Sequence, residues 1–212
     1  MEALRHDPVP PAVGRRFFAR GVVDVATALL GCYIVHTMDD VVVGGRIVET
    51  EAYGGPGDPG SHAHRAPSGR ARIMFGPAGV VYVYFTYGMH HCMNLVAEHD
   101  GKAGAVLLRA IEPVWGISVM RRGAPPALKD HLLASGPGRM CRALRVDRDL
   151  NGAEVARGPI TVHRRKRSAV EVHSGVRVGL SDDDGREWRF WLNSPSVSAT
   201  AALRTPGSGR RS

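Results

Sequence analysis

Two carboxylates and a tyrosine alternate in the segment Arg46–Gly55, which reads RIVETEAYGG. Alternate residues of a β-strand point to the same face, so Glu49, Glu51 and Tyr53 would share one face if this segment is a strand. Taken alone, the segment favours an exposed edge strand that carries charged side chains. The alternative is a carboxylate poised as a general base, next to an aromatic ring that stacks on a substrate.

Aromatic residues gather in YVYFTYGMHHCMN, Tyr82–Asn94, although they make up only 6% of the chain. The same period of two places Tyr82 and Tyr84 on one face. A cross-strand aromatic ladder would explain both of them. Tyr87 precedes a glycine at the expected tip of a hairpin, where a ring has little to pack against. The residues expected on the core face of this strand are Val81, Val83 and Phe85.

An arginine interrupts the apolar segment VLLRAIEP, Val106–Pro113. Burying an isolated charge is costly, so Arg109 is expected to pair with a carboxylate across a sheet, and Glu51 is a candidate. A purely structural ion pair and a functional one are equally compatible with this segment.

The histidines are spaced poorly for a metal site. His90 and His91 are adjacent, so on a strand they would point to opposite faces. His62 and His64 have a better spacing, but the sequence offers them no evident third ligand. We therefore expect neither a metal nor another cofactor.

The elements that must position these residues follow from periodicity and turn signals. One amphipathic helix is expected where Val23, Ala26 and Leu30 recur before Gly31. Two more helices are expected at Trp115–Arg122 and Pro137–Leu144. The loop Gly54–Gly79 has no periodicity, and loops of that length are usually functional or disordered. Strands are expected at Cys32–Thr37, Val41–Tyr53, Val80–Thr86, His91–Ala97, Ala105–Ile111, Ile160–Val162, Val176–Val178 and Arg189–Leu192.

Together these elements predict one mixed α/β domain without internal repeats. The domain is expected to span residues 14–203, between a flexible N-terminal segment (1–13) and a flexible C-terminal tail (204–212). No apolar run approaches the length that spans a bilayer, and the N-terminus lacks the apolar region of a secretory signal. We therefore expect a soluble, cytoplasmic protein.

The chain has a net charge of +8, and arginine supplies most of the positive charge. Such an excess is compatible with a polyanionic partner, although coding bias toward arginine would produce it too. The three cysteines, Cys32, Cys92 and Cys141, are scattered and odd in number, so we expect reduced, buried thiols.

Four segments, taken in this order, resemble the alkyladenine (3-methyladenine) DNA glycosylase family. They read GRIVETEAYGGPGDPGSHA, VYVYFTYGMHHCMN, AVLLRAIEP and SGPGRMCRAL. The likeness runs from about Val23 to Pro195. It implies a curved, largely antiparallel β-sheet flanked by helices, with a protruding β-hairpin that enters DNA.

The resemblance also implies residue roles. Glu51 matches the general base that activates a water, and Arg109 matches the residue that holds this water and the carboxylate. Tyr87 matches a side chain that intercalates where the base was. The positions matching the base-binding pocket are Tyr53, His62, Tyr84, Asn94 and Leu107, with Asn94 hindering the exocyclic amine of guanine. Further DNA contacts are expected at Tyr82, Met89, His90 and Arg72.

The implied activity is a monofunctional glycosylase that flips alkylated, and also deaminated, purines out of duplex DNA and leaves an abasic site. A glycosylase that also cuts the strand needs an amine nucleophile, and the few lysines (Lys102, Lys129 and Lys166) lie outside the pocket motifs. The enzyme would act as a monomer on damaged double-stranded DNA, associated with the nucleoid. The alternatives are a non-catalytic lesion-binding protein of the same fold and a hydrolase of small nucleosides.

Overall fold

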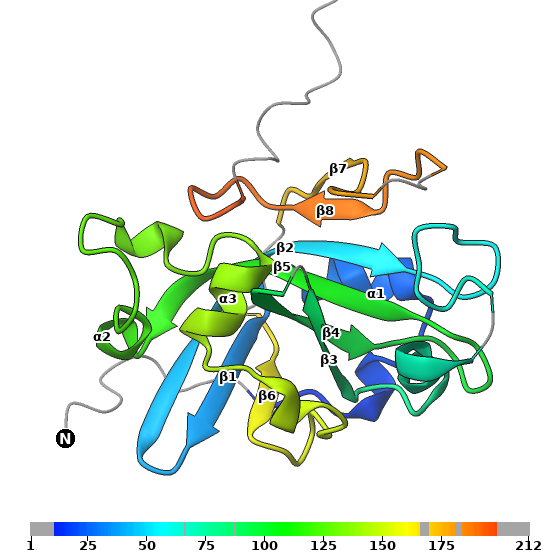
Figure 1. The fold of residues 1–212 in the computed structure, drawn as a ribbon, viewed down its shortest axis with the longest axis horizontal. Coiled ribbons are helices and arrows are strands. Elements are labelled where there is room, and N and C mark those ends of the chain that lie inside the picture. The colour runs from blue at the N-terminus through cyan, green and yellow to red at the C-terminus, as the bar shows by residue number, and fades with distance from the viewer. Residues whose placement is uncertain (1–10, 66, 87, 166–169, 181–183, 199–212) are drawn as a thin grey trace, which may run out of the picture.

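A 13-residue strand, β2 (Val41–Tyr53), runs through the centre of the sheet in the computed structural model. The structure describes residues 11–65, 67–86, 88–165, 170–180 and 184–198 (Figure 1). The strand order is β3-β4-β5-β2-β1-β6, and β8 pairs with both β2 and β7. Every pairing between these strands is antiparallel. The predicted single domain with a curved antiparallel sheet and a few helices is therefore confirmed.

The remaining strands are short, apart from β5, which is one of the neighbours of β2. That neighbour, β5 (Ala105–Trp115), has 11 residues and pairs with β2 along most of its length. The strands β3 and β4 form an antiparallel pair across residues 87–89. The bounds of the other strands are β1 (Tyr33–Met38), β3 (Val81–Thr86), β4 (His90–Val96), β6 (Ile160–His163), β7 (His173–Gly175) and β8 (Arg189–Trp191).

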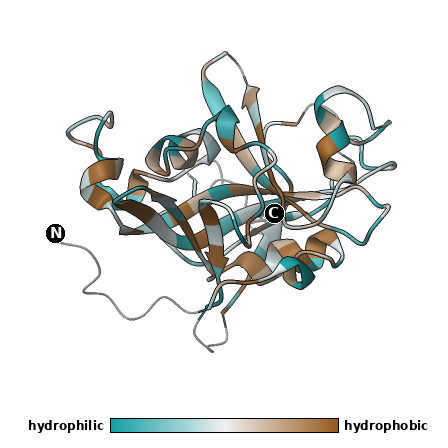
Figure 2. Ribbon diagram, turned by 90° about the horizontal axis from the view of Figure 1, so that it is seen from below, coloured by the Kyte–Doolittle hydropathy of each residue, from teal (hydrophilic) through white to brown (hydrophobic). Residues whose placement is uncertain are grey.

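The α-helices are α1 (Val22–Leu29), α2 (Ile117–Met120) and α3 (Pro137–Ala143). Helix α1 packs on β2 and β5, and α3 packs on β4 and β5. Figure 2 shows brown, apolar bands on the helices and strands where these elements meet. Four 3-10 turns complete the described elements: Arg15–Phe17 (η1), Gly69–Phe75 (η2), Asp130–Leu132 (η3) and Arg148–Leu150 (η4).

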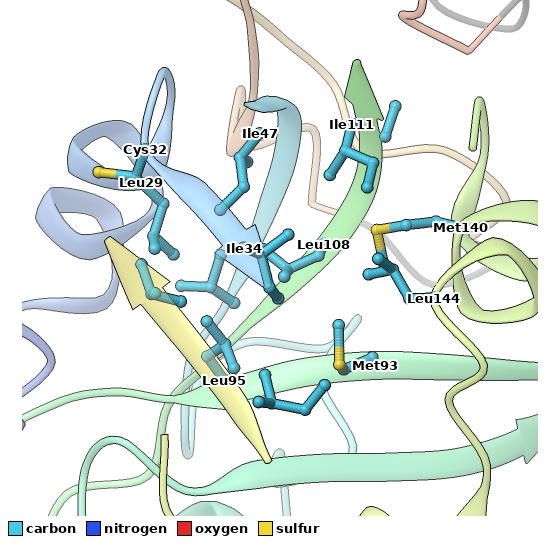
Figure 3. Packing of buried hydrophobic residues seen from close by; sticks show 14 of the residues in the cluster. Leu29, Cys32, Ile34, Ile47, Met93, Leu95, Leu108, Ile111, Met140 and Leu144 are labelled. Carbon is cyan, nitrogen blue, oxygen red and sulfur yellow. The ribbon is translucent and has the colours of Figure 1, made fainter. Parts of the chain in front are cut away.

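Alternation along the strands separates the hydrophobic core from a polar face. On the core face, Leu95, Leu108 and Ile34 pack among apolar residues of α1 and α3 (Figure 3). Thr50 also points to the core side, where its hydroxyl donates to the backbone oxygen of Ala26 in α1. The intervening residues of β2 to β5 therefore project to the other face. The three cysteines are buried and free, as predicted.

Three sequence-based expectations about elements are wrong. The helix expected at Trp115–Arg122 is only the short α2, because β5 continues through Trp115 opposite Gly44 and a left-handed Gly116 (φ 70°) separates the two elements. The segment Val176–Val178 is not a strand, since β7 ends at Gly175. Phe85 is 44% exposed and does not belong to the core; it lies near the end of β3, opposite His91 of β4.

The ends of the chain fall mostly outside the described residues. These include the predicted C-terminal tail (204–212) and most of the predicted N-terminal segment (1–13). At the described end of that segment, Val13 is buried and its amide donates to the backbone oxygen of Val162. Within the described residues, no helix is long and apolar enough to cross a membrane.

Candidate active site

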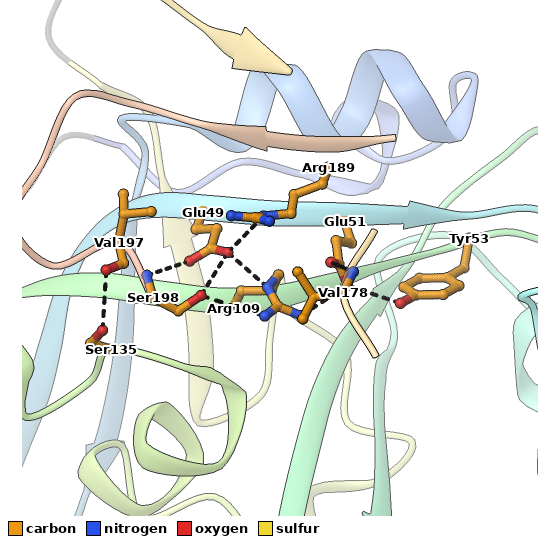
Figure 4. Close-up of polar contacts among 9 residues, drawn as sticks. All are labelled: Glu49, Glu51, Tyr53, Arg109, Ser135, Val178, Arg189, Val197 and Ser198. Carbon is orange, nitrogen blue, oxygen red and sulfur yellow. Dashed lines mark hydrogen bonds and ion pairs between the residues drawn. The ribbon is translucent and has the colours of Figure 1, made fainter. Parts of the chain in front are cut away.

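The polar face of the sheet carries one fully buried carboxylate that receives three hydrogen bonds. Glu51 is 0% exposed. Its Oε2 accepts from Tyr53 Oη at 2.9 Å and from Arg109 Nη1 at 3.1 Å, and its Oε1 accepts from the backbone amide of Val178 at 2.8 Å (Figure 4). Arg109 was the partner expected for Glu51, and the structure brings the two together. The exposed-edge interpretation of this segment is wrong, because β5 and β8 pair with the two edges of β2 at Glu51.

A second buried carboxylate, Glu49, holds Arg109 from its other side. Arg109 Nε donates to Glu49 Oε1 at 2.8 Å, and Arg189 Nε donates to the same oxygen at 3.0 Å. The backbone amide and hydroxyl of Ser198 also donate to Glu49, at 2.8 and 3.0 Å. Two carboxylates thus face two guanidinium groups in this cluster (Figure 4). Sequence reasoning assigned no partner to Glu49 and missed both Arg189 and Ser198.

Two register shifts in the β2–β5 ladder bring Arg109 close to the carboxylates of Glu49 and Glu51. Ile47 is opposite Ile111, but Glu49 is opposite Ala110 and Thr50 is opposite Leu108. One extra residue on β2 is therefore followed by one extra residue on β5, and the extra residue on β5 is Arg109. Bulges of this kind re-aim side chains. Here the extra residue on β5 is Arg109 itself, and its guanidinium donates to both Glu49 and Glu51.

Arg109 stays charged in this environment. Burial opposes its charge, but the attraction of Glu51 and then of Glu49 outweighs burial and raises the pKa of the guanidinium. Burial lowers the pKa of Arg189, although Glu49 counteracts this effect. Glu51 therefore contacts one positive charge, the Arg109 guanidinium, and two neutral donors, the Tyr53 hydroxyl and the Val178 amide.

Next to Glu51, aromatic side chains line a small cavity. Its lining includes Tyr53, His62, Tyr84 and Asn94, all predicted for a pocket, together with Gly60, Met74, Tyr82 and Leu180. The rings of His62 and Tyr84 meet edge to face, with centroids 4.8 Å apart. The structure thus brings four of the five predicted pocket residues together. The fifth, Leu107, is buried in β5, opposite both Glu51 and Asn94 in the ladders, and is not part of this lining.

The rings around the cavity are uncharged near neutral pH. Burial raises the pKa of Tyr82 to about 12, and burial also raises the pKa of Tyr84. Burial, followed by the adjacent Glu51 charge, raises the pKa of Tyr53 well above its ordinary value. Burial of the His62 ring, followed by the charge of Arg70, lowers its pKa to about 4. The His62 Nδ1 and the Tyr82 hydroxyl lie 2.9 Å apart and can share a hydrogen bond.

Residues expected to contact DNA occupy different environments. Tyr87 lies outside the described residues. Met89 is 69% exposed, and His90 and Arg72 are also exposed. Tyr82, by contrast, is only 2% exposed, so its side chain forms part of the cavity wall and not of the outer surface.

An open groove adjoins the tyrosines along β3, and sequence reasoning did not identify it. Its lining carries three arginines, Arg70, Arg72 and Arg148, beside Tyr84 and Phe85. The Arg70 guanidinium lies over the Tyr84 ring, 5.5 Å from its centroid. The groove and the aromatic cavity share Tyr82 and Tyr84, and the guanidinium groups of the groove suit an anionic ligand.

Within the described part of the chain, no group of three or more His, Cys, Asp or Glu side chains is arranged to hold a metal ion.

Comparisons with known proteins agree on one family. A model of the family described as methylpurine-DNA glycosylase matches residues 16–196. A Streptomyces avermitilis protein, provisionally named 3-methyladenine DNA glycosylase, is 49% identical over 190 residues, which cover 87% of this chain and 89% of that protein. Proteins with the same provisional name from Nitrobacter winogradskyi and Methanocella arvoryzae are 44% and 43% identical. They cover 87% and 90% of this chain, and 88% and 98% of their own lengths.

Proposed function

The chain belongs to the methylpurine-DNA glycosylase family, and we propose that it is a monofunctional glycosylase acting on alkylated purines that are flipped out of duplex DNA. The proposal rests mainly on the environment of Glu51. It is a fully buried carboxylate, held by three donors, beside an aromatic cavity. The proposed acting unit is a monomer.

In the proposed mechanism, the damaged base enters the cavity and stacks between Tyr53 and Tyr84, with His62 beside them. A purine alkylated at a ring nitrogen is cationic, and neutral aromatic faces attract a cation by about 0.5–2 kcal/mol per contact. The uncharged state of these rings supports this role. The cavity would therefore bind a cationic base more tightly than a normal, neutral one.

Glu51 is the proposed general base. It takes a proton from a water molecule, whose oxygen then bonds to the sugar C1′. The N-glycosidic bond breaks, and its electron pair leaves with the base, so that a cationic base departs as a neutral molecule. Arg109 orients the carboxylate by donating to its Oε2. The carboxylate also stabilises the positive charge that develops on the sugar in the transition state.

Neutral deaminated purines such as hypoxanthine are the second proposed substrate class. Their departure requires protonation, because the leaving group would otherwise be an anion. We expect them to be excised more slowly than alkylated bases.

Asn94 is 3% exposed, and its Nδ2 donates to the backbone oxygen of Tyr82 at 3.2 Å. This bond supports a fixed position at the cavity wall, from which Asn94 would hinder the exocyclic amine of guanine.

Duplex DNA is the proposed partner. The net charge of +8 and the groove with Arg70, Arg72 and Arg148 support contacts to phosphates. Flipping a base costs a few kcal/mol of unstacking, and a side chain inserted into the gap offsets part of this cost. Tyr87, in the β3–β4 connection, is the proposed inserted residue, with Met89 and His90 beside it.

The experiment that tests this function uses duplex DNA methylated by an alkylating agent. The purified protein should release free 3-methyladenine or 7-methylguanine in the presence of EDTA, detected by mass spectrometry. The DNA strands should stay intact until alkali cleaves the abasic sites. Release of no base, together with tight binding of the methylated duplex, would identify the protein as a non-catalytic lesion binder instead.

A further inference from the structure

A buried ion pair lies next to Tyr53, one of the residues that line the aromatic cavity. The Arg177 and Asp58 side chains are 0% and 1% exposed, and each Arg177 Nη donates to one Asp58 carboxylate oxygen at 2.8 Å. Burial alone would raise the pKa of Asp58, but the hydrogen bonds from Arg177 and from the Gly54 amide lower it overall. The proposed mechanism uses neither residue.

Asp58 fixes the loop that follows Tyr53. Its Oδ2 accepts from the Gly54 amide at 2.7 Å, and its Oδ1 accepts from the Gly60 amide at 3.2 Å. A Cβ atom added at Gly60 would lie 2.7 Å from Leu180 Cδ1 and 2.9 Å from Arg177 Nη2. The loop at Gly60 therefore packs against Arg177 and Leu180 so closely that there is no room for a larger residue at this position.

Arg177 supports the Tyr53 ring directly. Its Cζ lies 4.9 Å from the centroid of that ring, which is within the range of a cation–π contact. Its Nη1 also donates to the backbone oxygen of Ala52, the residue before Tyr53. Both the ring of Tyr53 and the backbone that leads to it are thus held by one side chain.

The residue next to Arg177 contacts the catalytic carboxylate. The amide of Val178 donates to Glu51 Oε1 at 2.8 Å, and Tyr53 donates to Glu51 Oε2 at 2.9 Å. Two of the three donors to Glu51 therefore depend on where Arg177 lies. Arg177 and Val178 lie between the strands β7 and β8 and belong to neither of them.

We propose that Asp58 and Arg177 are a positioning pair, which holds Tyr53 and the Val178 amide so that Glu51 points at the reacting sugar. The proposal rests on the proposed glycosylase activity. Stability alone does not explain such a pair, because replacing a buried ion pair by neutral groups of similar volume is often neutral or stabilising. Misplacing a reacting group by about 1 Å, in contrast, can cost about 100-fold in rate.

The test compares the Asp58→Asn/Arg177→Met double variant with the wild type. The one oxygen of the introduced asparagine can still accept from the Gly54 amide, the shorter of the two loop bonds, while the 3.2 Å bond from Gly60 is lost. Met fills much of the volume of Arg, so the melting temperature should stay within a few degrees of the wild-type value. Single-turnover excision of 7-methylguanine should fall by about 10- to 100-fold. Hydrogen exchange at the Val178 amide should become faster, while exchange at the Leu192 amide, which donates to Val48, should not change.

The control is Arg46→Met/Glu112→Gln, which removes a partly exposed ion pair near the middle of β2 and should leave the excision rate unchanged. The proposal is overturned if the Asp58/Arg177 double variant excises bases and protects the Val178 amide as the wild type does. If the double variant does not fold, Arg177→Lys takes its place. It keeps the charge opposite Asp58 but loses the planar fork, and wild-type excision by it would also overturn the proposal. If the wild type releases no base, the proposed function fails, and amide exchange alone decides the positioning.

Discussion

Arg109 Nη1 lies 3.1 Å from Glu51 Oε2, and the other side of the same guanidinium is bound by Glu49. The proposed general base is therefore not paired with a mobile cation. Its partner is itself held by a second buried carboxylate, which receives further bonds from Arg189 and Ser198. The orientation of Glu51 thus depends on residues that do not line the aromatic cavity.

Glu49→Gln should destabilise the protein and slow excision. The substitution leaves two buried guanidinium groups facing one carboxylate, and breaking a buried pair in this way typically costs about 3–5 kcal/mol of unfolding free energy. Urea unfolding and single-turnover excision measure the two effects. The matched control is Glu112→Gln, at a partly exposed carboxylate of β5, which should cost about 1 kcal/mol or less. Equal losses for both variants would contradict the role given to Glu49.

Arg109→Lys should reduce excision although it keeps the positive charge. A lysine cannot present separate nitrogens in one plane to Glu49 and Glu51, as Arg109 does. We expect at least a roughly 10-fold lower single-turnover rate, because Glu51 loses part of its orientation, with little change in the affinity for lesion-containing duplex. A variant with wild-type excision would show that charge alone is sufficient at this position.

Two kinds of signal predicted parts of the site from the sequence. The resemblance to a known family pointed to His62 and Asn94, which line the cavity, and local periodicity pointed to other residues. The period of two placed Glu51 with Tyr53 and Tyr82 with Tyr84, and the cost of burying a lone arginine predicted that Arg109 pairs with a carboxylate. The contacts that were missed join segments far apart in the chain. Asp58 and Arg177 are 119 residues apart, and Glu49 and Ser198 are 149 apart. Irregular segments supply Arg177 and Ser198, and such segments carry no periodic signal.

The same limitation explains the incorrect prediction for the β2 face. A strand with two carboxylates is typical of an exposed edge when its neighbours are unknown. In the fold, β8 pairs with β2 at Glu49–Glu51 and brings Arg189 to Glu49. Because that pairing joins residues about 140 positions apart, burial of the carboxylates could not be inferred from the segment itself.

The low pKa of His62 should appear in the pH dependence of stability. Its pKa is about 4 in the folded protein and near 6.5 when unfolded. As the pH falls, the His62 ring of the unfolded chain is protonated before that of the folded protein. The contribution of neutral His62 to folding stability is therefore complete above pH 6.5 and is lost as the pH falls toward 4. Between these values, thermal stability of the wild type should fall more steeply than that of His62→Gln. Parallel curves for the two proteins would contradict the shift.

Tyr87→Ala should affect DNA more than folding. If Tyr87 fills the space of the flipped base, its loss should weaken binding of a lesion-containing duplex and reduce flipping, measured by the fluorescence of 2-aminopurine beside the lesion. The melting temperature should change little. Val41→Ala is the control, since Val41 is an exposed apolar residue at the start of β2 and lines neither the groove nor the cavity. An unfolded Tyr87→Ala protein, or equal effects of both variants on flipping, would contradict the intercalation.

The most direct measurement is single-turnover excision by Glu51→Gln on duplex oligonucleotides that each contain one defined lesion. Glutamine has nearly the same shape as glutamate but cannot accept a proton from water at neutral pH. We predict that the variant binds the 7-methylguanine duplex as the wild type does and excises the base about 100- to 10,000-fold more slowly, the range expected for loss of a general base. Excision at the wild-type rate would show that Glu51 is not the residue that activates water.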